Sequence, residues 1–173
     1  MLALLALLYC GPRATPGIEA EEYEVFSAVI SSLYRDYYPQ EQLLVLNATT
    51  DDPGGKYYRD EHTREVINRL RPLLKSTTLK NYRTRNKQAY PLEARLDINR
   101  NYVLLSREDA DAALTGSNGW VTVSRVGFDA DRNQALLLVI NSSGPLRGAG
   151  YFVLMVKKNG RWEIGRQETL FVS

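Results

Sequence analysis

The chain is poor in the two residue types that most often build metal and redox sites. Its 173 residues include one Cys and one His. A single Cys excludes a disulfide within the chain, and one Cys with one His cannot supply the ligands of a Cys/His zinc site. Ser/His/Asp catalysis would depend on His62, which no Gly-x-Ser-x-Gly motif accompanies. We therefore interpret His62 as an exposed residue at the start of a helix.

Phosphate-binding and calcium-binding motifs are also missing. No Walker loop or dinucleotide fingerprint occurs, and the Gly-x-Gly of Gly148 and Gly150 leads into a strand, whereas phosphate cradles require a helix N-terminus. Residues 129–133 (Asp-x-Asp-x-Asn) match three calcium-loop positions, but Gln134 and Ile140 stand where that loop requires Gly and Glu. We interpret these residues as a polar hairpin turn, and we expect no cofactor and no metal.

The longest apolar run, residues 1–9, is too short to span a membrane. At about 1.5 Å per residue it reaches roughly half of a ~30 Å hydrocarbon core. Such a run is typical of an export signal, and the Cys10 that follows it is similar to the lipidated Cys of bacterial lipoproteins. Two features depart from that pattern, since no basic residue precedes the run and Tyr9 occupies a position where a small residue is preferred.

We predict an export or lipoprotein-like signal and tether over residues 1–17, with Cys10 as the lipidation candidate. The protein is then exported, and either periplasmic or membrane-anchored through Cys10. The alternatives are an ordinary secretion signal cut near Thr15, which discards Cys10, and a cytoplasmic protein.

Residues 18–173 are predicted to form a single α+β domain. Apolar side chains recur at three- and four-residue spacing over residues 18–38 and 66–74, which indicates amphipathic helices, and Ser76 can cap a third. Runs rich in β-forming residues, separated by turn clusters, cover residues 42–47, 100–105, 121–128, 134–141, 151–157 and 162–172. We expect N-terminal helices packed on one face of a mainly antiparallel, hairpin-connected C-terminal sheet. The strand at 151–157 is apolar on both faces, so it is expected to be central.

One stretch is rich in cations and has no acid. Between Val66 and Leu92 there is no Asp or Glu, while seven basic residues occur there: Arg69, Arg71, Lys75, Lys80, Arg83, Arg85 and Lys87. Such a patch could contact an acidic protein or an anionic membrane surface, and nucleic acid is an unlikely partner for an exported protein. Alternatively, it is a solvated helix face balanced by the acids of residues 19–24.

Several C-terminal segments resemble a family. Residues 124–139 (SRVGFDADRNQALLLV) and 148–164 (GAGYFVLMVKKNGRWEI), with residues 90–109 and the 80–86 helix, resemble a recurrent group of uncharacterised bacterial exported, lipoprotein-like proteins. The resemblance implies no established activity. The family's usual pattern places two Cys in the Gly-rich hairpin, where this chain has Ser143 and Arg147, so a disulfide-braced loop is not available here.

These observations favour a non-enzymatic, envelope-associated domain that binds a protein, peptide or small ligand. The alternative is a carboxylate-dependent hydrolase with its site in the cleft between helices and sheet, drawing on acids such as Asp97, Glu108, Asp109 and Asp111. An enzyme of this kind should hold paired acids with a raised pKa in a concave site. A third hypothesis makes the basic stretch itself the functional face.

Overall fold

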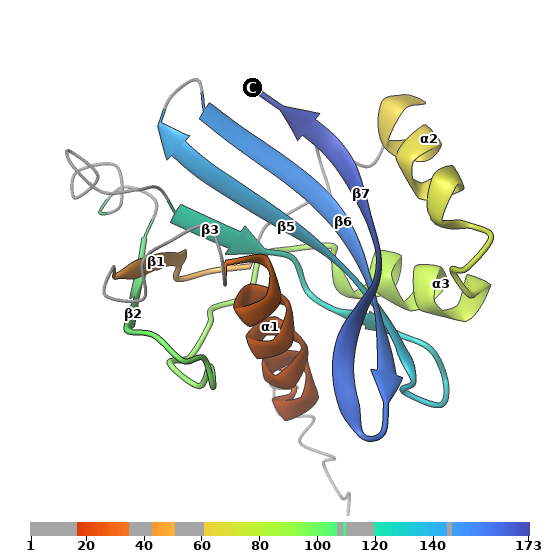
Figure 1. The fold of residues 1–173 in the computed structure, drawn as a ribbon, viewed down its shortest axis with the longest axis horizontal. Helices are drawn as coiled ribbons and strands as arrows, with labels where there is room; N and C mark the ends of the chain where they lie inside the picture. Colours follow the sequence, from red (N-terminus) through yellow and green to blue (C-terminus); the bar gives the residue numbers. More distant parts are fainter. Residues whose placement is uncertain (1–16, 35–42, 51–60, 107–108, 110–119, 145–146) are drawn as a thin grey trace, which may run out of the picture.

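A computed structural model describes residues 17–34, 43–50, 61–106, 109, 120–144 and 147–173. Within these ranges the chain forms three helices and seven strands (Figure 1). The helices are α1 (Ala20–Leu33), α2 (Glu61–Leu70) and α3 (Ser76–Arg85). The strands are β1 (Leu44–Asn47), β2 (Tyr102–Leu105), β3 (Trp120–Val123), β4 (Gly127–Phe128), β5 (Gln134–Gly144), β6 (Arg147–Lys158) and β7 (Arg161–Val172). The α+β class predicted from the sequence is therefore confirmed.

The strands form one mixed sheet, in the order β2-β1-β3-β5-β6-β7, with β4 also paired to β5. β5, β6 and β7 are long antiparallel neighbours joined in sequence order. β1 pairs in parallel with both β2 and β3. The largely antiparallel sheet is confirmed, but the expectation of a wholly C-terminal, hairpin-connected sheet is wrong. Parallel neighbours cannot be joined by tight hairpins, and β1 comes from the N-terminal half of the chain.

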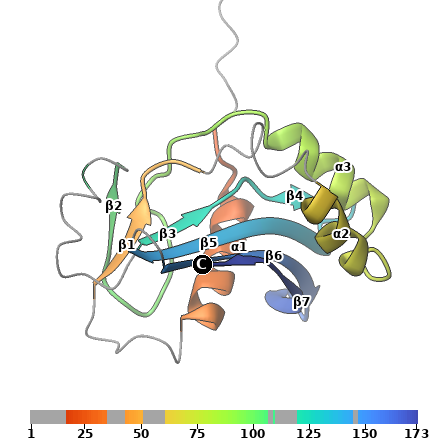
Figure 2. The same cartoon turned by 90° about the horizontal axis from the view of Figure 1, so that it is seen from above.

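The helices cover both faces of the sheet, and not one face as expected. Leu137 and Val139 lie in the hydrophobic cluster that contains α1 residues, whereas Leu136 and Leu138 lie in the cluster with α2 and α3 residues. Successive side chains of a strand point to opposite faces, so one strand serves two cores. Figure 2 shows α2 and α3 together on one side of the strands.

The expectation of a central strand near residues 151–157 is confirmed. β6 lies between β5 and β7, and the four consecutive residues Phe152, Val153, Leu154 and Met155 are all buried. The tight turn after β6 also has the expected chemistry. Asn159 and Gly160 have φ angles of 50° and 78°, the left-handed region that these two residue types tolerate best.

Several element boundaries differ from the predicted ones. α1 ends at Leu33, and the predicted continuation over residues 35–38 lies outside the described residues. Residues 121–128 form two strands, because residues 124–126 interrupt the ladder. Ser76 is the first residue of α3 and does not cap it; the capping position is Lys75. α2 ends at Leu70, two residues before Pro72.

Candidate functional site

The SRVGF segment, which contributes to the family resemblance, holds the core together around a buried ion pair. The Glu22 carboxylate of α1 is fully buried, and Arg125 is 4% exposed. Arg125 Nη2 lies 2.7 Å from Glu22 Oε1, and its Nε lies 2.9 Å from Oε2. The backbone N–H of Val126 donates to the same carboxylate at 2.9 Å, and Arg85 Nη1 approaches it at 3.0 Å. Nearly every lone pair of this buried charge is therefore satisfied, so its role is structural.

The rest of the segment packs against α3. A side chain at Gly127 would place its Cβ 2.3 Å from the Cβ of Tyr82, so only glycine allows this close approach. The ring of Phe128 lies beneath two guanidinium groups, those of Arg85 and Arg132, at 5.6 and 4.9 Å from its centroid. Sequence reasoning did not anticipate these contacts, because the partners are distant in the chain.

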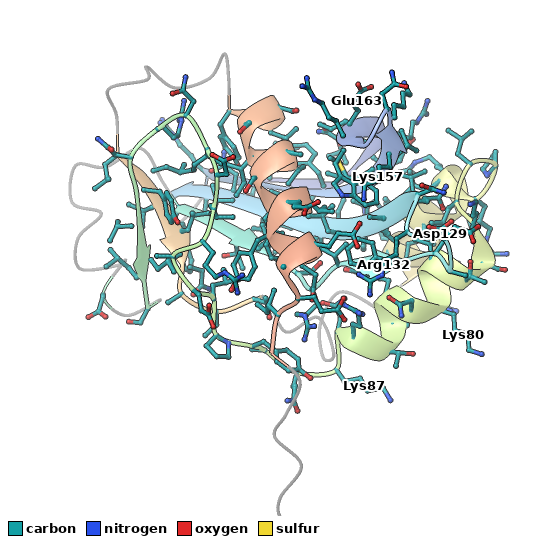
Figure 3. The ribbon with its side chains drawn as sticks, turned by 90° about the horizontal axis from the view of Figure 1, so that it is seen from below. Lys80, Lys87, Asp129, Arg132, Lys157 and Glu163 are labelled. Carbon is teal, nitrogen blue, oxygen red and sulfur yellow. The ribbon has the colours of Figure 1, made fainter. Side chains whose placement is uncertain are left out.

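The acids at the start of α1 pair with cations from three other parts of the chain: α3, the turn before β5, and β6. Arg132 contacts Glu19 and Glu21 at 2.7 and 2.8 Å, and Lys157 contacts Glu21 at 2.7 Å. Burial raises the pKa of Glu19, but hydrogen bonds from Arg132 and Arg85 outweigh it and the pKa is lowered. The pKa of Glu21 is lowered in the same way, against burial, by Lys157 and Arg132. Figure 3 shows Arg132 and Lys157 between α1 and the strands.

The Asp-x-Asp-x-Asn sequence forms the hairpin turn that we expected. Asp129 Oδ1 accepts hydrogen bonds from the backbone N–H groups of Asn133 and Gln134, both at 2.8 Å. Its Oδ2 contacts Lys75 Nζ at 2.5 Å. The carboxylate therefore closes its own turn and ties that turn to the start of α3. No group of three or more potential metal ligands occurs among the described residues.

His62 is exposed near the start of α2, as predicted. Its Nε2 lies 2.6 Å from the carbonyl oxygen of Leu170, so Nε2 carries the proton and donates it. This bond attaches α2 to β7, which gives His62 a structural contact.

Three of the seven basic candidates are held in ion pairs. Arg69 Nε lies 3.0 Å from Glu168, and Lys75 is bound by Asp129. Arg85 is bound by Glu19 and Glu22. The alternative that the acids of residues 19–24 balance the basic stretch is therefore correct for Arg85. These three cations are therefore occupied in structural contacts.

The other four cations line one surface groove. Arg71, Lys80, Arg83 and Lys87 are all exposed, and none forms an ion pair with another described residue. They surround a cavity of about 540 Å³, which Leu74, Ser76, Leu79 and Thr84 complete. We call this the basic groove. No acid contributes to it among the described residues, so the potential inside it is positive.

The local sequence explains how the basic groove is built. Lys80, Arg83 and Lys87 recur at three- and four-residue spacing, which places them on one side of α3 and its C-terminal extension. Arg71 follows the last residue of α2. Leu74 and Leu79 are buried and form an apolar floor. Lys80 and Lys87 project away from the strands (Figure 3).

The polar lining of the basic groove offers little beyond positive charge. The Thr84 hydroxyl donates to the Lys80 carbonyl oxygen at 3.0 Å, so it can only accept from a ligand. Ser76 is exposed and can donate or accept. A volume of this size is within the range of small-molecule sites. The groove therefore suits a ligand with several negative charges.

A second cavity, of about 280 Å³, lies beside α1 and contains Glu24 and Asp97 in its lining. Its hydroxyl groups already have partners: Tyr23 Oη accepts from the Glu93 N–H, and Ser27 Oγ accepts from the Asp97 N–H. The carboxyl groups of Glu19, Glu21, Asp129 and Glu168 have lowered pKa values. None of these four is therefore the acid of raised pKa that a carboxylate-dependent hydrolase requires, and the hydrolase stays an alternative.

Some predicted residues lie outside the described part of the chain. These are Cys10, Glu108, Asp111 and the side chain of Ser143. Arg147 is described and begins β6, where it is exposed. In the ranges that the structure covers, no helix is both long and apolar enough to cross a membrane.

No protein-family model matches the chain, and no curated protein or solved structure matches it either. The resemblance to exported bacterial proteins therefore stays a prediction, and the functional argument depends on the geometry of the basic groove.

Proposed function

We propose that the protein is an exported, envelope-associated binding domain without catalytic activity, and that it binds an anionic ligand in the basic groove. The observation that carries the proposal is the contrast among the seven candidate cations. Three of them are neutralised by acids, whereas the four that line the groove have no acidic partner in the described structure. Four unneutralised charges around one cavity repel one another, and a bound anion relieves that repulsion.

Two matched variants of the full chain test this proposal. The groove variant replaces the four groove cations with Gln: Arg71→Gln, Lys80→Gln, Arg83→Gln and Lys87→Gln. The control variant removes the same number of exposed cations elsewhere: Arg95→Gln, Arg147→Gln, Lys158→Gln and Arg161→Gln. Both variants change the net charge by the same amount, so any difference between them reports position and not total charge.

The measurement is a titration with inorganic pyrophosphate and, separately, with tetraglutamate, followed by backbone amide NMR. For the parent chain we expect shift changes concentrated in residues 71–87 with at least one of the two anions. The control variant should respond in the same way, and the groove variant should not. Shift changes scattered over all basic surfaces, or a response that the groove variant retains, would contradict the proposal.

The proposed location has its own test. Residues 1–17 are proposed as the signal and tether, with Cys10 lipidated. Intact mass of the protein extracted from membranes of its native host should then show a lipid adduct on a chain that begins at Cys10. A mature chain that lacks Cys10 would contradict anchoring but would still indicate export.

A further inference from the structure

The C-terminal end of the basic groove lies beside the point where the N-terminal segment joins the domain. Arg125 Nη2 contacts the Gly17 carbonyl oxygen at 3.4 Å. The side chain of Asn86 bonds the backbone of the same Arg125, at 2.8 Å to its N–H and 2.9 Å to its carbonyl oxygen. Lys87, a groove residue, follows Asn86 directly. Through Arg125 and Asn86, Gly17 is therefore linked to the groove residue Lys87.

The other end of the basic groove carries an exposed apolar side chain. Leu73 lies in the connection between α2 and α3, next to the groove residue Leu74, and is 57% exposed. Pro72 beside it is exposed as well. The Leu73 carbonyl oxygen accepts a hydrogen bond from Gln134 Nε2 at 2.9 Å, which fixes the backbone of the connection. The exposed Leu73 side chain therefore lies on backbone that is held in place, two residues after Arg71.

We propose that the ligand of the basic groove is the anionic headgroup layer of a membrane, with Leu73 entering the boundary between headgroups and acyl chains. This inference rests on the proposed function, because it names the ligand of the same site. Cations attract anionic headgroups, and a neighbouring apolar side chain adds binding that salt does not screen. The groove cations and Leu73 together provide both contributions.

The position of Gly17 favours a membrane as the partner. Residues 11–17 span at most about 25 Å when fully extended, at no more than ~3.6 Å per residue. A lipidated Cys10 would therefore keep the basic groove close to the bilayer, where even a weak contact has a high effective concentration.

The walls of the basic groove give an acidic peptide little to recognise. An extended peptide gains affinity and register from a free strand edge, but the groove is lined by α3 and by the connection before it, and no strand of the described structure contributes to its lining. The backbone N–H of Lys75 at the start of α3 is already donated to Gln134 at 2.8 Å. The floor residues Leu74 and Leu79 are both buried, so their side chains expose little apolar surface to a peptide. Recognition is therefore by charge, which suits fluid headgroups.

The test measures binding of the full chain to vesicles of phosphatidylcholine, with and without phosphatidylglycerol, at low and high salt. The parent chain and the control variant should bind the anionic vesicles more tightly than the neutral ones. In the groove variant this preference should fall by about fivefold for each cation removed, and so by a few hundredfold for all four. High salt should remove most of the preference of the parent chain.

Insertion of Leu73 is measured separately, because the apolar residues 1–9 can bind vesicles of either kind. A Leu73→Trp variant is titrated with both vesicle types, and the emission of the parent chain, from Trp120 and Trp162, is subtracted. We expect a blue shift and protection from acrylamide with anionic vesicles, and neither change with neutral ones. A Val172→Trp variant, at another exposed apolar residue, should show no change with either vesicle type.

Three results would overturn the membrane proposal, and they differ in what they say of the function. If groove and control variants bind anionic vesicles equally while tetraglutamate still shifts residues 71–87, the function stands and the ligand is an acidic peptide. If neither vesicles nor either soluble anion distinguishes the two variants, the proposed function fails as well. Absence of a blue shift with anionic vesicles also contradicts the membrane proposal, whatever the affinity.

Discussion

The side-chain amide of Gln134 in β5 accepts a hydrogen bond from the backbone N–H of Lys75 and so caps the N-terminus of α3. Its Oε1 accepts from the backbone N–H of Lys75 at 2.8 Å, and the capping residue makes no side-chain cap of its own. The same oxygen accepts from the Thr78 hydroxyl at 3.0 Å, and Nε2 donates to the Leu73 carbonyl oxygen. One buried amide therefore fixes both the start of α3 and the connection that presents Leu73.

The Gln134→Ala variant should be less stable, by about 1–3 kcal/mol in free energy of unfolding. It leaves the buried Thr78 hydroxyl and the Lys75 N–H without their acceptor. Urea denaturation measures the loss, and Gln167→Ala, at an exposed position in β7, is the matched control. Equal stability of the two variants would show that the Gln134 amide does not stabilise the start of α3 and the connection before it.

The Glu22→Gln variant should lose about 3–5 kcal/mol, because it leaves the Arg125 guanidinium buried without its counter-charge. Glu24→Gln, on the exposed side of the same helix, should change the free energy of unfolding by less than about 0.5 kcal/mol. Adding Arg125→Met to the Glu22 variant should cost little more, since it removes the orphaned charge. Fully additive losses in the double variant would contradict the pairing.

The Gly127→Ala variant should be destabilised by about 2 kcal/mol or more. The added Cβ would lie 2.4 Å from the Cα of Tyr82 as well as close to its Cβ, so the backbone of α3 must move. Gly17→Ala is the control, because nothing lies within 4 Å of its Cβ position. Thermal unfolding of both variants checks this, and a Gly127→Ala protein as stable as its control would contradict the close helix–strand contact.

Local patterns in the sequence predicted the α+β class, the interior position of β6 and the turn at Asn159-Gly160. They could not place β1 between β2 and β3, because parallel pairing depends on contacts between distant segments. The strand at 151–157 was expected to be apolar on both faces, but the helices were expected on one face only. That α1 packs on one face and α2 with α3 on the other depends on contacts between distant segments.

The sequence also located the basic stretch of the candidate site, but it could not separate its bound cations from its unbound ones. Arg69, Lys75 and Arg85 are neutralised by acids at least 54 positions away, and no local rule identifies such partners. Leu73 was visible as an apolar residue after Pro72 and was assigned to a helix face. Its exposure follows from the end of α2 at Leu70.

Acid should destabilise the protein through Asp129. Burial raises the pKa of this carboxyl group, but Lys75 and the N–H groups of Gln134 and Asn133 outweigh it, so the folded pKa is below the ordinary value of 3.8. At acidic pH the Asp129 carboxyl group therefore binds fewer protons in the folded state than in the unfolded state. Its stabilisation is therefore complete above about pH 4 to 5 and is lost as the pH falls through the folded pKa.

The measurement is the free energy of unfolding between pH 7 and pH 2 for the parent chain and for Asp129→Asn. The variant should be less stable at pH 7, and its stability should fall less steeply below pH 4, because the titrating group is gone. Glu19, Glu21 and Glu168 also have lowered pKa values and add to the slope in both proteins, so the difference between the two curves isolates Asp129. Parallel curves for the two proteins would mean that Asp129 has the same pKa in the folded and unfolded states, and that its bonds to Lys75 and to the turn do not stabilise the ionised form.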